Sequence, residues 1–245
     1  MCDLVAELKP NVVRFHFGLP EKKLFSRIRA TGAKILSSAT TVDEARWLEA
    51  QGFDAIVAQG FEAGGHRGMS LTDDISAQIG TLSLVPQVVD SVKVPVIAAG
   101  GIADARGIGA AFALGAATVQ LGTAYLLSPE ARISSLYRQG LRNEGNQTAL
   151  TNVFTGRPAR AMATRMVRET GPMSGLVPDF PLAAGFSAPL CVASEAKGSA
   201  DFTPIWSGQS FRLARELPAK EITQRLAAET LARLSSYGLL MGKRD

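Results

Sequence analysis

A strand pattern recurs along the first half of the chain, and this repeat limits the possible folds more than any other feature. Short runs rich in apolar and small residues begin at Val12, Lys34, Ala55, Val94 and Thr118. Near-continuous apolarity of this kind is typical of strands buried on both faces of a parallel sheet. Most starts lie roughly twenty residues apart, about the length of one strand and one helix. Repeated units of this length form either an open doubly wound sheet or a (β/α)₈ barrel.

Segments with helical start and stop signals lie between the strands. Thr41 and Glu44 form a predicted capping box ahead of a helix that Gly52 ends. Asp104 is placed to cap a second helix, which Gly115 ends. The alternation of strands and helices therefore predicts an α/β protein.

The composition of the 245 residues excludes several classes of protein. Hydrophobic residues make up 46% of the chain, enough for a sizeable core, so intrinsic disorder is excluded. Cys2 and Cys191 are too few for a disulfide framework or a four-thiolate zinc site, and they favour a reducing compartment. The sequence contains no apolar run long enough to span a membrane and does not begin like a signal peptide. We therefore expect a soluble, cytoplasmic protein with no membrane partner.

Charge and motifs argue against several other kinds of site. The 26 lysines and arginines exceed the 22 acidic residues by a net charge of +4, and they form no run, so no nucleic acid partner is expected. His16 and His66 lie outside any HxxxH or HExxH pattern, so no metal site is predicted. No GxSxG motif indicates a serine nucleophile. For Arg157 and Arg160, an ion pair or surface solvation is favoured over contact with an anion.

The loop after the third strand is the first candidate for a functional site. It runs from Gln59 to Gly68 and contains the pair Gly64-Gly65 directly before His66. Glycines let the backbone approach a flat ligand closely, and imidazole is suited to proton exchange near neutral pH. A loop histidine that hydrogen-bonds a carbonyl is the alternative for His66. His16 lies inside the first predicted strand, where a buried, hydrogen-bonded histidine is the favoured interpretation.

The next two strand ends predict an anion site. Gly100 and Gly101 follow the fourth strand and open a helix, and Gln120-Leu121-Gly122-Thr123 ends the fifth. Free amides at a helix start attract anions, and the last two loops of a barrel often bind one phosphate together. The sequence contains no strand followed by GxGxxG and no GxxxxGK[ST], which argues against a Rossmann or P-loop site.

Longer stretches around these loops resemble one enzyme family. GFEAGGHRG (residues 60–68), its flanks over residues 37–59 and 94–127, and the segments FHFGLP, TNVFTGRPAR and DFTPIWSGQ are similar to the nitronate monooxygenases, formerly called 2-nitropropane dioxygenases. The resemblance implies non-covalent FMN in a (β/α)₈ barrel with a smaller, partly helical domain over the site. It also implies oxidation of small alkyl nitronates, such as propionate 3-nitronate, by O2 to a carbonyl compound and nitrite.

The resemblance also assigns individual residues. His66 matches the catalytic histidine, which would remove the α-proton of neutral nitroalkanes or orient nitronates that are already anionic. Gln59 and Gly64 match positions that contact the flavin. The predicted FMN phosphate site, which agrees with the anion site above, comprises Gly101, Gln120, Leu121, Gly122 and Thr123.

The chain departs from the family in its strand count. Its first strand resembles the family's fourth, so we expect five of the eight barrel strands within residues 1–128, a cap over residues 129–205 and a C-terminal helical segment over residues 206–245 with a helix from Pro218 to Tyr237. Either the start of the gene is misassigned or this is a true short form. A five-stranded remnant would expose both sheet edges, so we expect it to be unstable alone or to recruit a partner, for example as a homo-oligomer.

Two other functions stay open from the sequence. A flavin-dependent enoyl-acyl-carrier-protein reductase shares the fold and a similar glycine-glycine-histidine loop, but it needs NAD(P)H. A truncated FMN-binding fragment without turnover is the second alternative. The continuation HRG and the segment FHFGLP favour the nitronate enzyme.

Overall fold

The computed structural model describes residues 2–236, and the chain divides into two compact units. The first unit comprises the residues up to Phe61, residues 68–99 and residues 111–120. The second comprises residues 62–67, residues 100–110 and the chain from Leu121 onward. Residues 237–245, which include the expected end of the last helix at Tyr237, lie outside the described residues.

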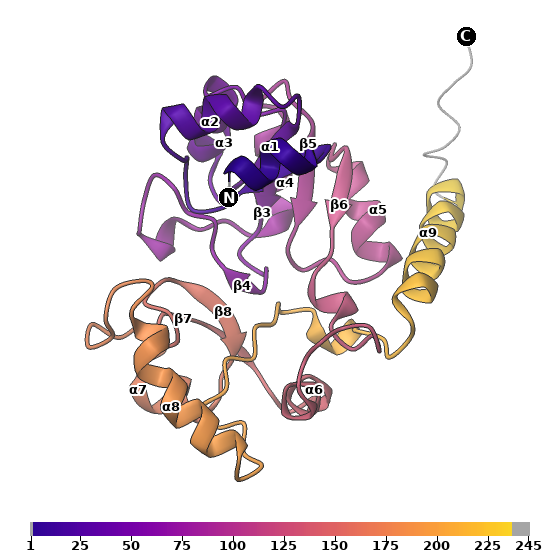
Figure 1. Cartoon of the computed structure of the whole chain (residues 1–245). Coiled ribbons are helices and arrows are strands. Elements are labelled where there is room, and N and C mark those ends of the chain that lie inside the picture. Colours follow the sequence, from indigo (N-terminus) through magenta and orange to yellow (C-terminus); the bar gives the residue numbers. More distant parts are fainter. Residues whose placement is uncertain (1, 237–245) are drawn as a thin grey trace. The chain divides into compact units, whose positions relative to one another are not determined.

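The first unit is built on a parallel sheet of five strands in the order β1-β2-β3-β5-β6 (Figure 1). The strands are β1 (Val12–Phe15), β2 (Lys34–Ala39), β3 (Ala55–Gln59), β5 (Val96–Ala99) and β6 (Thr118–Gln120). Each one lies inside a run predicted from the sequence. The predicted α/β fold with five parallel strands is therefore confirmed.

The helices of this unit are α1 (Cys2–Leu8), α2 (Lys22–Arg29), α3 (Val42–Ala50), the 3₁₀ turn η1 (Ile75–Ala77), α4 (Thr81–Val89) and α5 (Ala105–Ala113), which begins in the second unit. α1 precedes β1 and contacts α2, and the others lie between strands along the chain (Figure 1). α3 contacts β2 and β3, and α4 contacts β3 and β5. Leu48 of α3 and Leu84 of α4 are fully buried, so the core of this unit lies between the helices and the sheet.

The side chain of Arg14 shows that the sheet is strongly curved. Arg14 lies on β1 and Gln120 on β6, which are the edge strands of this sheet. In a flat sheet, four strand spacings of about 4.8 Å would separate the two strands. Arg14 Nη1 nevertheless donates to Gln120 Oε1 at 2.8 Å, and Nη2 donates to Ser38 Oγ at 2.6 Å. The sheet therefore curls until its edges are bridged, as the wall of a barrel does.

The start of α3 differs in one respect from the predicted capping box. Thr41 Oγ1 accepts from Glu44 N at 3.2 Å, as predicted. The fully buried Glu44 carboxylate, however, accepts from the amide and the hydroxyl of Thr40 instead of reaching back to the amide of Thr41. Its other oxygen accepts from the amides of Ser70 and Leu71. Glu44 therefore fastens the segment after β4 to the end of β2, in addition to capping its own helix.

The second unit contains an antiparallel sheet that the sequence did not reveal, in the order β4-β8-β7. Its strands are β4 (Gly65–His66), β7 (Thr148–Thr151) and β8 (Ala159–Met162). None of them contains the valine or isoleucine that marks each strand of the parallel sheet, so no strand signal stands out there. The other elements of this unit are η2 (Thr123–Tyr125), α6 (Ser135–Arg142), α7 (Arg165–Thr170), α8 (Ala183–Glu195), η3 (Phe211–Leu213) and α9 (Ala219–Ser236). Among the described residues of this unit, one small apolar cluster lies around Met162 and Ile205 and another around Phe154 and Ala161.

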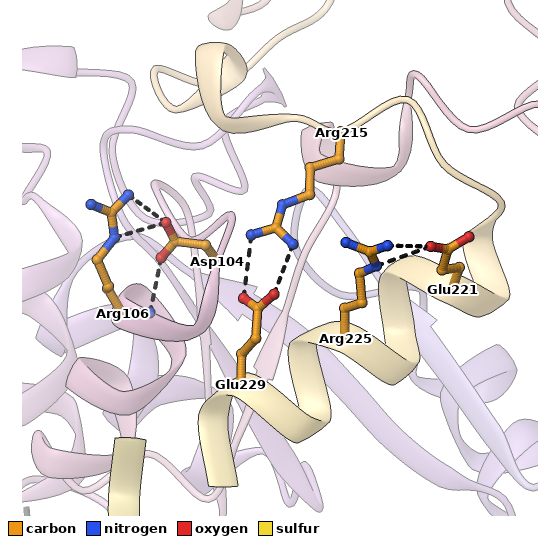
Figure 2. Close-up of polar contacts among 6 residues, drawn as sticks. All are labelled: Asp104, Arg106, Arg215, Glu221, Arg225 and Glu229. Carbon is orange, nitrogen blue, oxygen red and sulfur yellow. Dashed lines mark hydrogen bonds and ion pairs between the residues drawn. The ribbon is translucent and has the colours of Figure 1, made fainter. Parts of the chain in front are cut away.

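The last helix, α9, buries the apolar stripe predicted from its sequence. Its buried residues are Ile222, Leu226, Thr230 and Leu234. On its exposed side, Arg215 donates from both Nη atoms to Glu229 at 2.9 and 3.2 Å, while the pairs Arg225–Glu221 and Arg106–Asp104 lie on either side (Figure 2). Exposed ion pairs contribute little, so the buried stripe provides most of the attachment. Among residues 2–236, no helix is long and apolar enough to cross a membrane.

Replacing Glu44 tests its role in the first unit. In Glu44→Gln, an amide NH2 would face N–H donors that the carboxylate now satisfies, so we expect the free energy of unfolding to fall by about 2–3 kcal/mol. Urea unfolding followed by circular dichroism measures this change. Asp43→Asn, an exposed neighbour on the same helix, is the matched control and should leave stability nearly unchanged. An equal effect of both substitutions would contradict this role.

Candidate active site

The carboxyl ends of three neighbouring strands of the first unit lie side by side. Gln59, the last residue of β3, pairs in register with Ala99 of β5, and Ala99 pairs with Gln120 of β6. From these ends the chain continues into the second unit at Glu62, Gly100 and Leu121. Ligands of strand–helix folds bind at the carboxyl ends of the strands. The two predicted glutamines therefore lie at the carboxyl ends of the strands, where such folds place their ligand-binding sites.

The side chains of both glutamines are held by hydrogen bonds within the first unit. The buried Gln59 Oε1 accepts from Gly68 N at 2.7 Å, and Gln120 Oε1 accepts from Arg14 as described above. These bonds fix the orientation of each amide group. No local sequence pattern indicates that Arg14 orients Gln120, because the two residues meet only through the curvature of the sheet.

In the second unit, residues 207–210 join the three loops that follow these strands, and we call this segment the 207–210 strap. Gln209 N donates to Glu62 O at 3.0 Å. Gly208 N donates to Thr123 Oγ1 at 3.0 Å, and Ser210 Oγ donates to Gly101 O at 2.5 Å. One short segment therefore sets the relative positions of the loops that carry Gly64, Gly101 and Thr123.

Glycine is required at Gly64 because the strap passes so close to it. A Cβ on Gly64 would lie 2.5 Å from Gly208 N and 2.6 Å from Ser207 C, closer than such atoms approach in proteins. At the second loop, Gly100 and Gly101 adopt φ values of 108° and 68°, which side chains disfavour. The backbone therefore gives a physical reason for glycine at positions 64, 100 and 101.

The loops held by the strap provide amide groups suited to a phosphate. Within residues 2–236, the backbone N–H groups of Gly101, Gly122 and Thr123 make no hydrogen bond. Gly101 and Gly122 are exposed, and Leu121, directly before Gly122, is half-buried. Backbone amides of this kind are typical anion ligands. The residues present therefore fit the phosphate group that the sequence predicts here.

His66 lies on a short strand rather than in a loop. On β4, Gly65 pairs with Arg160 and His66 pairs with Ala159 of β8. His66 is half-buried, and its Nε2 lies 2.9 Å from Thr155 Oγ1. Phe180 contacts the imidazole edge-on, with ring centroids 5.9 Å apart, and Trp206 lies tilted against it at 5.3 Å. The predicted catalytic residue is therefore enclosed by aromatic rings and bound to a hydroxyl.

This environment favours the neutral imidazole. Burial lowers the pKa of His66 below its usual 6.5, and the positive charge of Arg157 lowers the pKa further. At pH 7 the ring is then mostly neutral, which is the form that can accept a proton.

Arg160 and His16 do not lie where the sequence predicted. Arg160 is buried on β8 and is not solvated at the surface. Its Nη1 donates to Thr148 Oγ1 at 3.3 Å, and the charge of Glu62 acts on its guanidinium. His16 lies one residue beyond the end of β1, not inside the strand, and its ring centroid is 4.4 Å from that of Phe17. His16 belongs to the first unit and His66 to the second.

Sequence reasoning missed Thr155, Phe180, Trp206 and the 207–210 strap as parts of the site. Thr155 and the strap lie in stretches that carried the family resemblance, but no spacing rule linked them to His66. They come together through contacts between segments far apart in the chain, such as the 89 residues between His66 and Thr155. The assignments of His66, Gln59, Gly64, Gly101 and the 120–123 segment stay predictions.

Comparison with known proteins yields one consistent group. A family model described as nitronate monooxygenase matches residues 1–229. The nitronate monooxygenase of Pseudomonas aeruginosa is 43% identical over 228 residues, which cover 92% of this chain and 65% of the relative. A probable nitronate monooxygenase of Staphylococcus saprophyticus is 39% identical over 230 residues, or 93% of this chain and 65% of the relative. The chain thus spans 65% of the length of these curated relatives.

Two solved structures are similar to this one over nearly the whole chain. The nitroalkane oxidase from Streptomyces ansochromogenes matches with a TM-score of 0.88 and 39% identity over 96% of this chain and 68% of that one. FabK from Thermotoga maritima matches with a TM-score of 0.74 and 31% identity over 96% and 73% of the two chains.

Replacing Gly64 tests the contact between the β4 loop and the 207–210 strap. In Gly64→Ala the new methyl group would displace the backbone of the strap, so the free energy of unfolding should fall by about 1–3 kcal/mol. Gly109→Ala on α5, where a Cβ would meet nothing within 4 Å, is the control. It should stabilise the helix by about 0.5–1 kcal/mol. Chemical denaturation of both variants measures these changes, and a stable Gly64→Ala would show that the strap is not tightly packed.

Proposed function

Because the chain belongs to the nitronate monooxygenase family, we propose that it oxidises alkyl nitronates, such as propionate 3-nitronate, with O2 and FMN to a carbonyl compound and nitrite. The observation that carries this proposal is the placement of His66 on a short strand, where its imidazole contacts two aromatic rings and burial lowers its pKa. As the chain spans 65% of its curated relatives, the activity is proposed for this chain and is to be tested on it directly.

The cofactor assignment rests on the loops that the strap joins. We assign the FMN phosphate to the amides of Gly101, Gly122 and Thr123, with Gln120 and Leu121 beside them in the chain. We assign contacts with the flavin ring to Gln59 and Gly64. When bound, FMN supplies the redox chemistry, while the chain binds it, orients it and tunes its surroundings.

In this proposal, His66 handles the proton of the substrate. A neutral nitroalkane must lose its α-proton before oxidation, and the neutral imidazole of His66 accepts it. A nitronate has already lost that proton, so His66 then orients and stabilises the anion. Phe180 and Trp206 shield the ring from water, which strengthens its electrostatic interaction with a bound anion.

The proposed partners are small molecules only, the nitronate and O2, and we place the protein in the cytoplasm. Self-association into a homo-oligomer is part of the proposal, because β1 and β6 are edge strands of the sheet described.

Anaerobic mixing tests the proposed reaction against both alternatives. The full chain is loaded with FMN and mixed with propionate 3-nitronate without O2, and the flavin absorbance is followed. Bleaching by the nitronate supports the proposal. Bleaching by NADPH alone would support an enoyl-acyl-carrier-protein reductase instead, and failure to retain FMN would support a fragment without turnover.

A matched substitution separates the proton step from cofactor binding. His66→Asn should lower turnover of neutral nitroethane by about 100-fold, a typical contribution of a general base. Its dissociation constant for FMN should change little, and the nitronate should lose less rate than the nitroalkane. Undiminished turnover of nitroethane would remove His66 from the proton step.

The acid limb of the pH profile should report the surroundings of His66. As the pH falls through the pKa of His66, below 6.5, the imidazole is protonated and kcat/KM for nitroethane should fall. Arg157→Gln removes a positive charge that opposes protonation, so this limb should move to higher pH. Arg165→Gln, which removes an exposed arginine paired with Glu169 on α7, is the control and should leave the limb in place. A limb that does not move in Arg157→Gln would contradict the assignment of this pKa to His66.

A further inference from the structure

The hydroxyl of Thr155 lies between His66 and a backbone carbonyl. His66 Nε2 is 2.9 Å from Thr155 Oγ1, and Thr155 Oγ1 donates to Arg157 O at 3.4 Å. All of these groups belong to the second unit. The direction of the two hydrogen bonds determines which nitrogen of the neutral ring carries its proton.

The carbonyl of Arg157 favours one direction for these two bonds. A carbonyl oxygen can only accept, and the hydroxyl of Thr155 has a single proton to donate. When that proton points to Arg157 O, the proton between Thr155 and the ring must belong to His66 Nε2. The neutral imidazole is then the Nε2–H tautomer, with its lone pair on Nδ1.

A tight turn after β7 holds Thr155 in place. The amides of Thr155 and Gly156 both donate to Asn152 O, at 3.3 and 2.7 Å. The side chain of Asn152 is fixed in turn, because Nδ2 donates to Ser174 O at 2.9 Å and Oδ1 accepts from Ser174 N at 3.0 Å. Gly156 has a φ of 84°, and a Cβ there would collide with Pro178 O. A hydroxyl on such a fixed backbone can select one tautomer.

The aromatic contacts limit rotation of the imidazole. Phe180 meets the ring edge-on and Trp206 lies tilted against it. Trp206 is itself anchored, since its carbonyl accepts from the hydroxyl of Tyr137 at 2.5 Å and the residue bridges to Ala161 of β8. The ring is thus held on two sides while Thr155 binds Nε2.

We propose that Thr155 is a positioning residue that holds His66 in the Nε2–H tautomer, so that Nδ1 is the nitrogen that takes the α-proton from a neutral nitroalkane. This inference rests on the proposed function and adds the atom at which the base acts. In the step, the α-carbon–hydrogen bond breaks, the proton bonds to Nδ1, and the electron pair stays on the substrate, which becomes the nitronate. Nε2–H remains bonded to Thr155 throughout.

The charges around His66 predict how the hydroxyl affects its titration. Charged residues on the surrounding elements are Glu62, Arg67, Arg157, Asp179 and Arg160. Burial and Arg157 lower the pKa of His66, whereas an accepting hydroxyl binds the imidazolium more strongly than the neutral ring. Removing the hydroxyl should therefore lower this pKa further.

Nuclear magnetic resonance reads the tautomer directly and without turnover. The chain has only two histidines, so long-range ¹H–¹⁵N spectra of the full chain labelled in histidine contain two rings. His16→Asn assigns them. We expect the His66 ring above its pKa to show a protonated Nε2 and an unprotonated Nδ1, with or without added FMN. A ring protonated at Nδ1 would overturn the proposal.

Three substitutions separate positioning from a general effect on the fold. Thr155→Val keeps the shape but loses the hydroxyl, so both tautomers should appear and the pKa of His66 should fall. Thr155→Ser restores the hydroxyl and should restore the wild-type spectrum. Thr170→Val, at the exposed end of α7, is the control and should change neither signal. A Thr155→Val ring with the wild-type tautomer and pKa would overturn the proposal.

Turnover then links the tautomer to the reaction. Thr155→Val should lower kcat for nitroethane on the order of tenfold, with little change in KM and little effect on the nitronate. If the wild type shows the Nε2–H tautomer but does not turn over nitroethane, the proposed function fails while the positioning by Thr155 stands. If Thr155→Val shifts the tautomer but keeps the wild-type kcat, the assignment of the proton step to Nδ1 is overturned.

Discussion

The hydrogen bonds of the 207–210 strap are the constraint on which the rest of the candidate site depends. They reach Glu62, Gly101 and Thr123, one residue in each loop that follows a strand end. The loops themselves contain Gly64, Gly65, Gly100, Gly101 and Gly122, and glycine leaves the backbone many accessible conformations. The strap therefore constrains the loops that carry Gly101 and Thr123, to which we assign the phosphate, and it packs against Gly64, directly before β4.

The surroundings of His66 combine three separate physical effects. Burial and the charge of Arg157 lower the pKa of the imidazole, two aromatic rings pack against it, and the Thr155 hydroxyl lies 2.9 Å from its Nε2. Arg157, Phe180, Trp206 and Thr155 all belong to the second unit, like His66 itself. In the proposed reaction these contacts would orient the base.

Local patterns predicted the elements that local physics determines. The five parallel strands and the buried stripe of α9 follow from periodicity. The caps follow from the residue types, since Thr41 accepts from Glu44 N at the start of α3 and Asp104 accepts from Arg106 N at the start of α5. The strands β4, β7 and β8 contain no valine or isoleucine, so they lack such a signal. Arg14 with Gln120, and Thr155 with His66, are tertiary pairs 106 and 89 residues apart, so no local pattern could identify them. Arg160 resembled a surface charge in the sequence because burial depends on the whole unit.

The long-range nature of the strap also has a consequence for protein synthesis. Its bonds to Thr123 and Gly101 span 85 and 109 residues. The ribosome makes all five strands of the parallel sheet well before it reaches residue 207. The growing chain can therefore form the sheet early, but its glycine loops stay without the strap until residues 207–210 emerge. During that interval the loops are open to misfolding, so a chaperone would have its greatest effect on the yield of folded protein.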